Sequence, residues 1–160
     1  MRRPPNQRIA DEAISAWRLT AIIFSLIPVA LSIGAWYVYY EFSFLSLWIP
    51  ILITVLTIID LILSPFVFPK IRWRRWRYEV LNEEIFIQHG VLIVTQTLIP
   101  MVHVQHVDTK QGPILSKYKL ATLTITTAAT THEIPALRES EAAELRDLIS
   151  ELARVEQDDV

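Results

Sequence analysis

The chain contains no cysteine and only three glycines among its 160 residues. Without cysteine it can form no disulfide, thiol nucleophile or thiolate metal site. So few glycines leave no glycine-rich loop of the kind that cradles phosphate groups. Charge is equally scarce in two long stretches, residues 19–40 and 47–68, where Asp60 is the only charged side chain. These absences exclude several catalytic classes and draw attention to two apolar runs.

Each apolar run is long enough to cross a bilayer. At about 1.5 Å per residue, either run spans a hydrocarbon core of roughly 30 Å as a helix. The connector between them, residues 41–46, is short, so residues 18–69 are predicted to form an antiparallel two-helix transmembrane hairpin. Aromatic side chains near the connector are expected to form a belt at one membrane interface. They are Trp36, Tyr37, Tyr39, Tyr40 and Trp48.

The distribution of basic residues predicts the orientation of this hairpin. Arg2, Arg3, Arg8 and Arg18 precede the first run, five basic residues follow the second, and the connector has none. Because short cytoplasmic flanks are rich in Lys and Arg, both termini are expected to be cytoplasmic, with residues 1–17 forming a cytoplasmic segment. A cleaved signal peptide is the rival interpretation of the first run. It is disfavoured because the run is too long and is followed by aromatic residues.

Asp60 lies near the middle of the second run, at the depth that Pro28 occupies in the first. An intramembrane acid is costly unless it is paired or protonated. A structural interpretation has a protonated Asp60 donating a hydrogen bond near Ser25, Pro28 and Ser32, which would lock the hairpin or an oligomer. The alternative is an ion or proton pathway in an oligomeric transport or channel assembly, because two helices alone cannot enclose a pore.

A basic and aromatic cluster follows the second run directly. Its position beside a predicted span favours contact with anionic lipid headgroups over nucleic acid. The expected lipid-binding residues are Lys70, Arg72, Trp73, Arg74, Arg75, Trp76 and Arg77.

Residues 70–157 are predicted to form a soluble α+β domain. Residues 78–81 and 84–88 alternate as a β-hairpin, residues 91–99 form a third strand, and a β-bulge near Gln105 and His106 restores the register of a fourth. Residues 122–126 predict a strand with a threonine-rich outer face, and residues 131–134 a last strand ended by Pro135. Apolar residues at helical spacing then predict a C-terminal helix capped by Ser140.

Several sequence segments resemble the YdbS-like bacterial membrane proteins that carry a pleckstrin-homology-like (bacterial PH) domain. The segments are Arg-Tyr-Glu-Val at 77–80, Ile-Pro-Met-Val-His-Val-Gln-His-Val-Asp-Thr at 99–109, Gln-Gly-Pro-Ile-Leu-Ser-Lys-Tyr-Lys-Leu-Ala at 111–121 and Thr-Ala-Ala-Thr-Thr-His-Glu-Ile-Pro-Ala-Leu at 127–137. The resemblance implies a split, bent β-barrel capped by the C-terminal helix, a bacterial inner or plasma membrane, no catalysis, and the company of a larger relative of the same fold. The short acidic turn at 81–84 does not favour phosphoinositide binding.

No pattern in the domain predicts an enzyme. His103 and His106 lack a third ligand for a metal, and no nucleophile elbow or oxyanion loop is present, so no catalytic residue and no cofactor is expected. We expect a polar strand edge to bind a protein partner or a second copy, through Gln105, His106, Asp108, Thr109 and Lys110. The sequence thus predicts a non-enzymatic, membrane-anchored adaptor without nucleic-acid or small-molecule substrate, serving envelope maintenance or resistance to membrane-active peptides.

Overall fold

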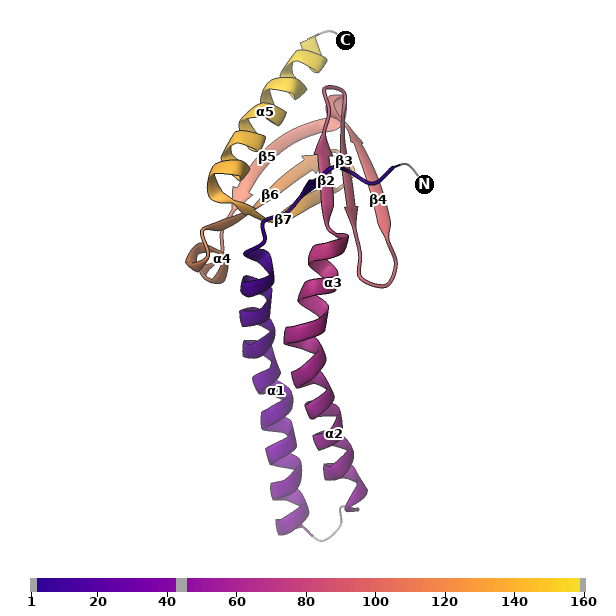
Figure 1. The fold of residues 1–160 in the computed structure, drawn as a ribbon, viewed down its shortest axis with the longest axis vertical. Helices are drawn as coiled ribbons and strands as arrows, with labels where there is room; N and C mark the ends of the chain where they lie inside the picture. Colours follow the sequence, from indigo (N-terminus) through magenta and orange to yellow (C-terminus); the bar gives the residue numbers. More distant parts are fainter. Residues whose placement is uncertain (1–2, 43–45, 159–160) are drawn as a thin grey trace. The chain divides into compact units, whose positions relative to one another are not determined.

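The computed structural model describes residues 3–42 and 46–158. Part of the predicted connector, residues 43–45, and the basic residue Arg2 lie outside this part of the chain. The described residues divide into two compact units: a helical unit from Trp17 to Lys70, and a domain made of the residues before Trp17 together with those from Ile71 onward. Figure 1 shows the elements of each.

The helical unit contains the two predicted spans. Helix α1 runs from Ala13 to Glu41. In the second run, α2 (Trp48–Ile62) is followed by a π-helical turn (Leu63–Val67), and α3 (Phe68–Arg75) continues past the end of the run. Both runs are long and apolar enough to cross a membrane by length and composition. Pro65 lies within the π-helical turn. Because proline has no N–H to donate and crowds the preceding turn, a local widening of the helix is the expected response.

The strands of the domain form two antiparallel sheets. The first has the order β1-β2-β3-β4, built from β1 (Gln7–Arg8), β2 (Arg77–Val80), β3 (Glu84–His89) and β4 (Thr95–Pro100). The second has the order β5-β6-β7, built from β5 (Val104–Lys110), β6 (Leu120–Thr127) and β7 (Thr131–Arg138). A single turn, Met101–His103, links the sheets, and the short helix α4 (Pro113–Lys117) links β5 to β6.

The C-terminal helix α5 (Glu139–Asp158) covers the second sheet. It packs on β5, the Met101–His103 turn and β6, and Figure 1 shows it beside these strands. Its buried side chains, Ala142, Leu145, Ile149 and Ala153, recur at helical spacing and so form one stripe. The α+β fold with a C-terminal helix is as predicted. Among the described residues, however, no strand pairing joins the two sheets, so they do not form a closed barrel.

The core lies between the sheets and α5. Tyr78, Ile85 and Ile87 come from the first sheet, and Leu123 and Ile125 from the second, all at most 2% exposed. The alternation of Ile85 and Ile87 with their neighbours predicted β3, and that of Leu123 and Ile125 with threonines predicted β6. The predicted bulge is confirmed, because the pairing of β5 with β6 shifts register between Val104 and His106.

Four predicted details were wrong. The third strand begins at Thr95 rather than Val91, because residues 91–94 form a loop. Thr124 is buried rather than part of an outer face, since both faces of β6 are covered there. The last strand continues past Pro135 to Arg138. Ser140 is not an N-cap, because α5 already begins at Glu139.

The extension of β7 past Pro135 depends on a bulge. Ala121 pairs with Leu137 while Leu123 pairs with Ile134, so two residues of β7, Pro135 and Ala136, face one residue of β6. Ala136 adopts a φ of 54°, in the left-handed region. Proline is tolerated on an edge strand and at bulges because it interrupts the ladder only locally. The strand therefore resumes after the interruption.

The N-terminal segment belongs to the domain. Gln7 pairs with Tyr78 and Arg8 with Arg77, which makes β1 an edge strand of the first sheet. Ile9 is 2% exposed, and the Ala10 amide donates to the Ala136 carbonyl at 3.2 Å. Glu12 accepts from Arg138 at 3.2 Å. The segment predicted as a separate cytoplasmic region thus contacts both sheets.

Replacing Ile9 by alanine should destabilise the whole domain, although more than 60 residues separate Ile9 from the part of the domain that begins at Ile71. Removing a buried isoleucine side chain costs about 2–5 kcal/mol when the cavity cannot collapse. We expect urea unfolding, followed by tryptophan fluorescence of the detergent-solubilised protein, to show this loss. Val155→Ala, at a position 55% exposed on α5, is the control and should change little. Equal unfolding midpoints for the two variants would mean that the burial of Ile9 does not stabilise the domain.

Candidate functional surfaces

The basic cluster is divided between exposed and packed side chains. Lys70, Arg72, Arg74 and Arg75 are exposed, and the last three lie in the final turn of α3, where positive charge complements the helix dipole. Trp76, by contrast, is 8% exposed. It stacks on His89 with ring centroids 5.2 Å apart. The side chains of Lys70, Arg74 and Arg75 thus lie at the surface, Arg72 is exposed but has a contact within the protein, and Trp76 is part of the domain core.

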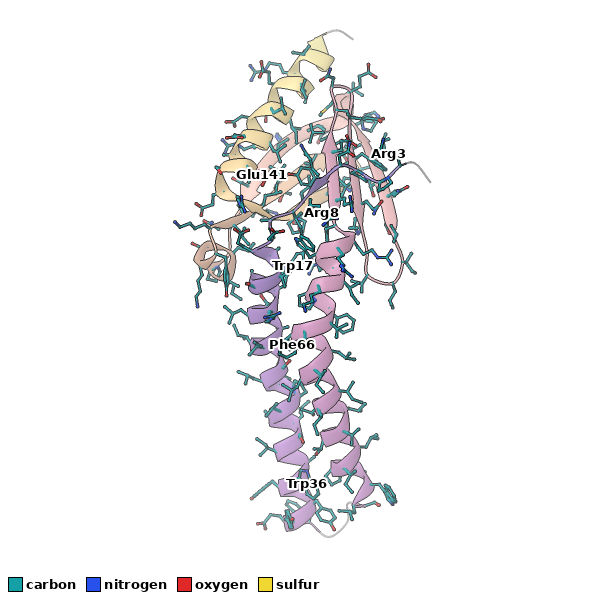
Figure 2. The ribbon with its side chains drawn as sticks, in the orientation of Figure 1. Arg3, Arg8, Trp17, Trp36, Phe66 and Glu141 are labelled. Carbon is teal, nitrogen blue, oxygen red and sulfur yellow. The ribbon has the colours of Figure 1, made fainter. Side chains whose placement is uncertain are left out.

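Trp73 and Arg77 are also engaged within the domain. The guanidinium of Arg8 lies 5.2 Å from the centroid of the Trp73 ring, and Figure 2 shows Arg8 on the N-terminal segment. Arg77, on β2, donates to the Pro5 carbonyl at 3.5 Å. Sequence reasoning assigned these residues to lipid because of their neighbours in sequence. It could not foresee that the N-terminal segment would supply them with contacts.

The five predicted partner-binding residues share one strand. Gln105, His106, Asp108, Thr109 and Lys110 are all exposed on β5. Among the described residues β5 pairs only with β6, so its other edge carries no strand. A groove of about 250 Å³ lies between β5 and α5, lined in part by Gln105, Val107 and Arg154. The structure thus gathers the predicted residues into one polar strip on an edge strand.

A polar seam joins the two helices of the helical unit. The Ser25 hydroxyl lies 3.1 Å from Oδ2 of Asp60 and 2.9 Å from the Ala21 carbonyl. The hydroxyl of Ser25 is the donor in both contacts, so it is shared between the Asp60 carboxyl group of the other helix and a carbonyl of its own helix. The expected contact of Asp60 with the neighbourhood of Pro28 is present.

The seam continues toward the connector. Thr57 donates to the Pro28 carbonyl at 3.2 Å. Thr54 and Ser32 are joined at 3.0 Å, and the Trp36 indole, labelled in Figure 2, donates to Thr54 at 3.0 Å. Sequence reasoning missed both threonines. The signal was present, since Thr54, Thr57 and Asp60 recur every three residues and so share one helix face.

A cleft opens between the two sheets of the domain. Two adjoining hollows of about 370 and 320 Å³ share His132, with Trp76, Ile87 and His89 on one side and Thr131 on the other. Burial lowers the pKa of His89, and the neighbouring His132 and Arg72 add to this effect. In the part of the chain that the structure describes, no three His, Asp or Glu side chains gather as potential metal ligands.

Tyr78 and Glu141 connect β2 to α5. The Tyr78 hydroxyl donates to Oε1 of Glu141 at 2.5 Å, and Figure 2 shows Glu141 on α5. Burial raises the pKa of Tyr78, and the hydrogen bond to Glu141 and its negative charge add to this effect. The phenol is thus a permanent donor near neutral pH. The hydrogen bond between Tyr78 and Glu141 positions α5 against β2. No pattern in the sequence indicated a contact between two residues that are 63 positions apart.

Comparison with known proteins gives a consistent result. A family model described as bacterial PH domain matches residues 9–153, a range that includes the helical unit. The UPF0699 transmembrane protein YdbS of Bacillus subtilis (strain 168) is 46% identical over 164 residues, and the alignment covers all of both chains. No solved structure matches the chain.

Asp60→Asn should preserve the hairpin, because the side-chain carbonyl of asparagine can accept the hydrogen bond that Ser25 donates to Asp60. Asp60→Leu should weaken it by about 1 kcal/mol, the usual size of a hydrogen bond between membrane helices. Thermal unfolding in the same detergent measures both. If Asp60→Asn destabilised as much as Asp60→Leu, the negative charge itself would be required. Proton flux measured in liposomes would separate this structural role from transport. The structural role predicts the same flux for Asp60→Asn as for the unaltered chain.

Proposed function

Because the chain belongs to the bacterial PH domain family, we propose that it is a non-enzymatic adaptor whose membrane hairpin holds the PH-like domain at the cytoplasmic leaflet. There the domain contacts anionic lipid and a protein partner. The partner is a larger membrane protein of the same fold or a second copy of this chain. Envelope maintenance, including resistance to membrane-active peptides, is the process we propose for it.

The observation that carries this proposal is the pairing of β1 with β2. Strand β1 precedes the first apolar helix, and β2 follows the second. Two segments of one sheet must be on the same side of a membrane, so this pairing supports a multi-pass hairpin with both ends on one face. The excess of arginine beside both helices favours the cytoplasmic face. A domain tethered at two points has little freedom to leave the surface.

The arginines of α3 support contact with anionic lipid. Arg72, Arg74 and Arg75 are exposed and directly follow an apolar run. A basic side chain near an anionic leaflet contributes about 1 kcal/mol of attraction. Lys70 adds a further exposed positive charge at the end of the helical unit.

The edge strand β5 supports contact with a partner. It offers backbone groups along one edge and exposed polar side chains beside them. Such an edge can receive an additional strand, for which main-chain hydrogen bonds supply affinity and the side chains specificity. The hydrogen-bonded seam around Asp60 favours a structural role for that residue, so the adaptor requires no transport step.

Changing Arg72, Arg74 and Arg75 to glutamine should deplete anionic lipid around the protein. We expect mass spectrometry of lipid nanodiscs, extracted directly from native membranes, to find less co-purified anionic lipid than for the unaltered chain. The matched control replaces three basic residues elsewhere in the domain, Lys117, Lys119 and Arg146, by glutamine and should retain the anionic lipid. Equal lipid profiles for the two triple variants would exclude headgroup contact by α3.

The same nanodiscs should contain a stoichiometric partner or a second copy of the chain. Placing arginine at His106 and Thr109 should displace that partner from β5, because bulk and charge then obstruct the edge. Arginine at the exposed positions Ser116 and Glu151 provides the control. Retention of the partner by the β5 variant would exclude this edge, and a monomer without any partner would contradict the adaptor function.

A further inference from the structure

The loop between β3 and β4 carries the two most exposed large apolar side chains among the described residues. Leu92 is 92% exposed and Ile93 is 81% exposed. Single exposed apolar residues are common on protein surfaces, but two adjacent ones at a loop tip are not explained by packing. The sequence predicted a strand for this segment, which would have paired these residues within the sheet.

The shape of this loop depends on Gly90. Its φ is 124°, a conformation that other residues rarely adopt. A Cβ atom at this position would lie 1.8 Å from the Ile93 carbonyl oxygen. The chain therefore turns tightly at Gly90, and only glycine allows this approach. The turn leaves Leu92 and Ile93 outside the sheet.

Strand register places the loop at a defined end of the first sheet. Arg77 pairs with Gln88, and His89 pairs with Thr95, so the loop lies at the end where β2 begins, as Figure 1 shows. This is also the end that α3 reaches with Arg72, Arg74 and Arg75. The opposite end of the β2–β3 hairpin is its turn, where Asn82 and Glu83 are exposed.

One end of the sheet therefore combines a strongly exposed apolar tip with exposed arginines. The turn at the other end exposes Asn82 and Glu83 beside Leu81, which at 44% is about half as exposed as Leu92. A bilayer has two layers that match these two features. Its anionic headgroups attract arginine, and its acyl interior accepts apolar side chains. Chain connectivity favours the same match, because only a few residues separate β2 from the second apolar run. A water-filled cytosol offers no such complement to Leu92 and Ile93.

We propose that Leu92 and Ile93 insert into the acyl layer of the membrane that the chain itself spans. The loop is a third apolar contact of the protein with lipid, besides its two long helices. This inference goes beyond the proposed function, because it requires neither anionic lipid nor a protein partner. Insertion would fix the rotation of the domain on the membrane surface and so select which strands face the cytosol.

The absence of cysteine permits a direct test with the full-length protein. Val91→Cys, labelled with an environment-sensitive fluorophore, leaves both apolar side chains in place, and Leu92→Cys reports on the tip itself. Asn82→Cys, in the turn at the other end of the same hairpin, is the matched control. Each protein is reconstituted in phosphatidylcholine vesicles with and without phosphatidylglycerol, and quenching by nitroxides on the lipid acyl chains is compared with quenching by aqueous iodide.

If the loop inserts, fluorophores at positions 91 and 92 should show blue-shifted emission and be quenched by nitroxides on the acyl chains. Iodide should quench only the fluorophore at position 82. This result should persist in phosphatidylcholine alone, in high salt and in the triple arginine-to-glutamine variant, because screening removes only the headgroup attraction. Iodide quenching at position 92 equal to that at position 82 would overturn the proposal. Protection from both quenchers would also overturn it, by assigning the loop to a protein contact.

Discussion

The pairing of Gln7 and Arg8 with β2 is the constraint on which the remaining architecture depends. It brings together two segments separated in sequence by both apolar helices. The burial of Ile9, the bond from Ala10 to Ala136 and the ion pair between Glu12 and Arg138 extend the contact from the first sheet to the second. The N-terminal segment is thus a structural component that joins two sheets between which residues 3–42 and 46–158 show no strand pairing.

The helical unit relies on a different kind of interaction. In lipid, apolar surfaces gain little by meeting one another, so hydrogen bonds and close packing specify how membrane helices associate. The contacts of Ser25 with Asp60 and of Ser32 with Thr54 supply such bonds at intervals along the pair. Outward-facing residues such as Phe24, Leu31 and Leu56 are correspondingly exposed and apolar. Polar groups face the partner helix and apolar groups face outward, the reverse of a soluble domain.

Local patterns in the sequence were sufficient for much of this structure. Uninterrupted apolar runs predicted the two helices, alternation predicted β2 and β3, and a change of parity predicted the bulge at Gln105. Long-range contacts were not accessible in the same way. A two-residue strand has no alternation to detect, and the partners of Trp73 and Trp76 come from other elements. Of the residues expected to bind lipid or a partner, the four basic residues 70, 72, 74 and 75 and the five on β5 are exposed, whereas packing covers Trp76.

The β1–β2 pairing also has consequences for how the protein is made. The ribosome must complete both apolar helices and begin the domain before β1 has a strand to pair with. A contact between such distant segments forms late, because the intervening chain has to be closed first. A chain inserted with one helix on the wrong side would leave Ile9 without its buried site. Completion of the domain is therefore coupled to the placement of both helices, because β1 and Ile9 reach their sites only when the two ends of the hairpin lie on the same side.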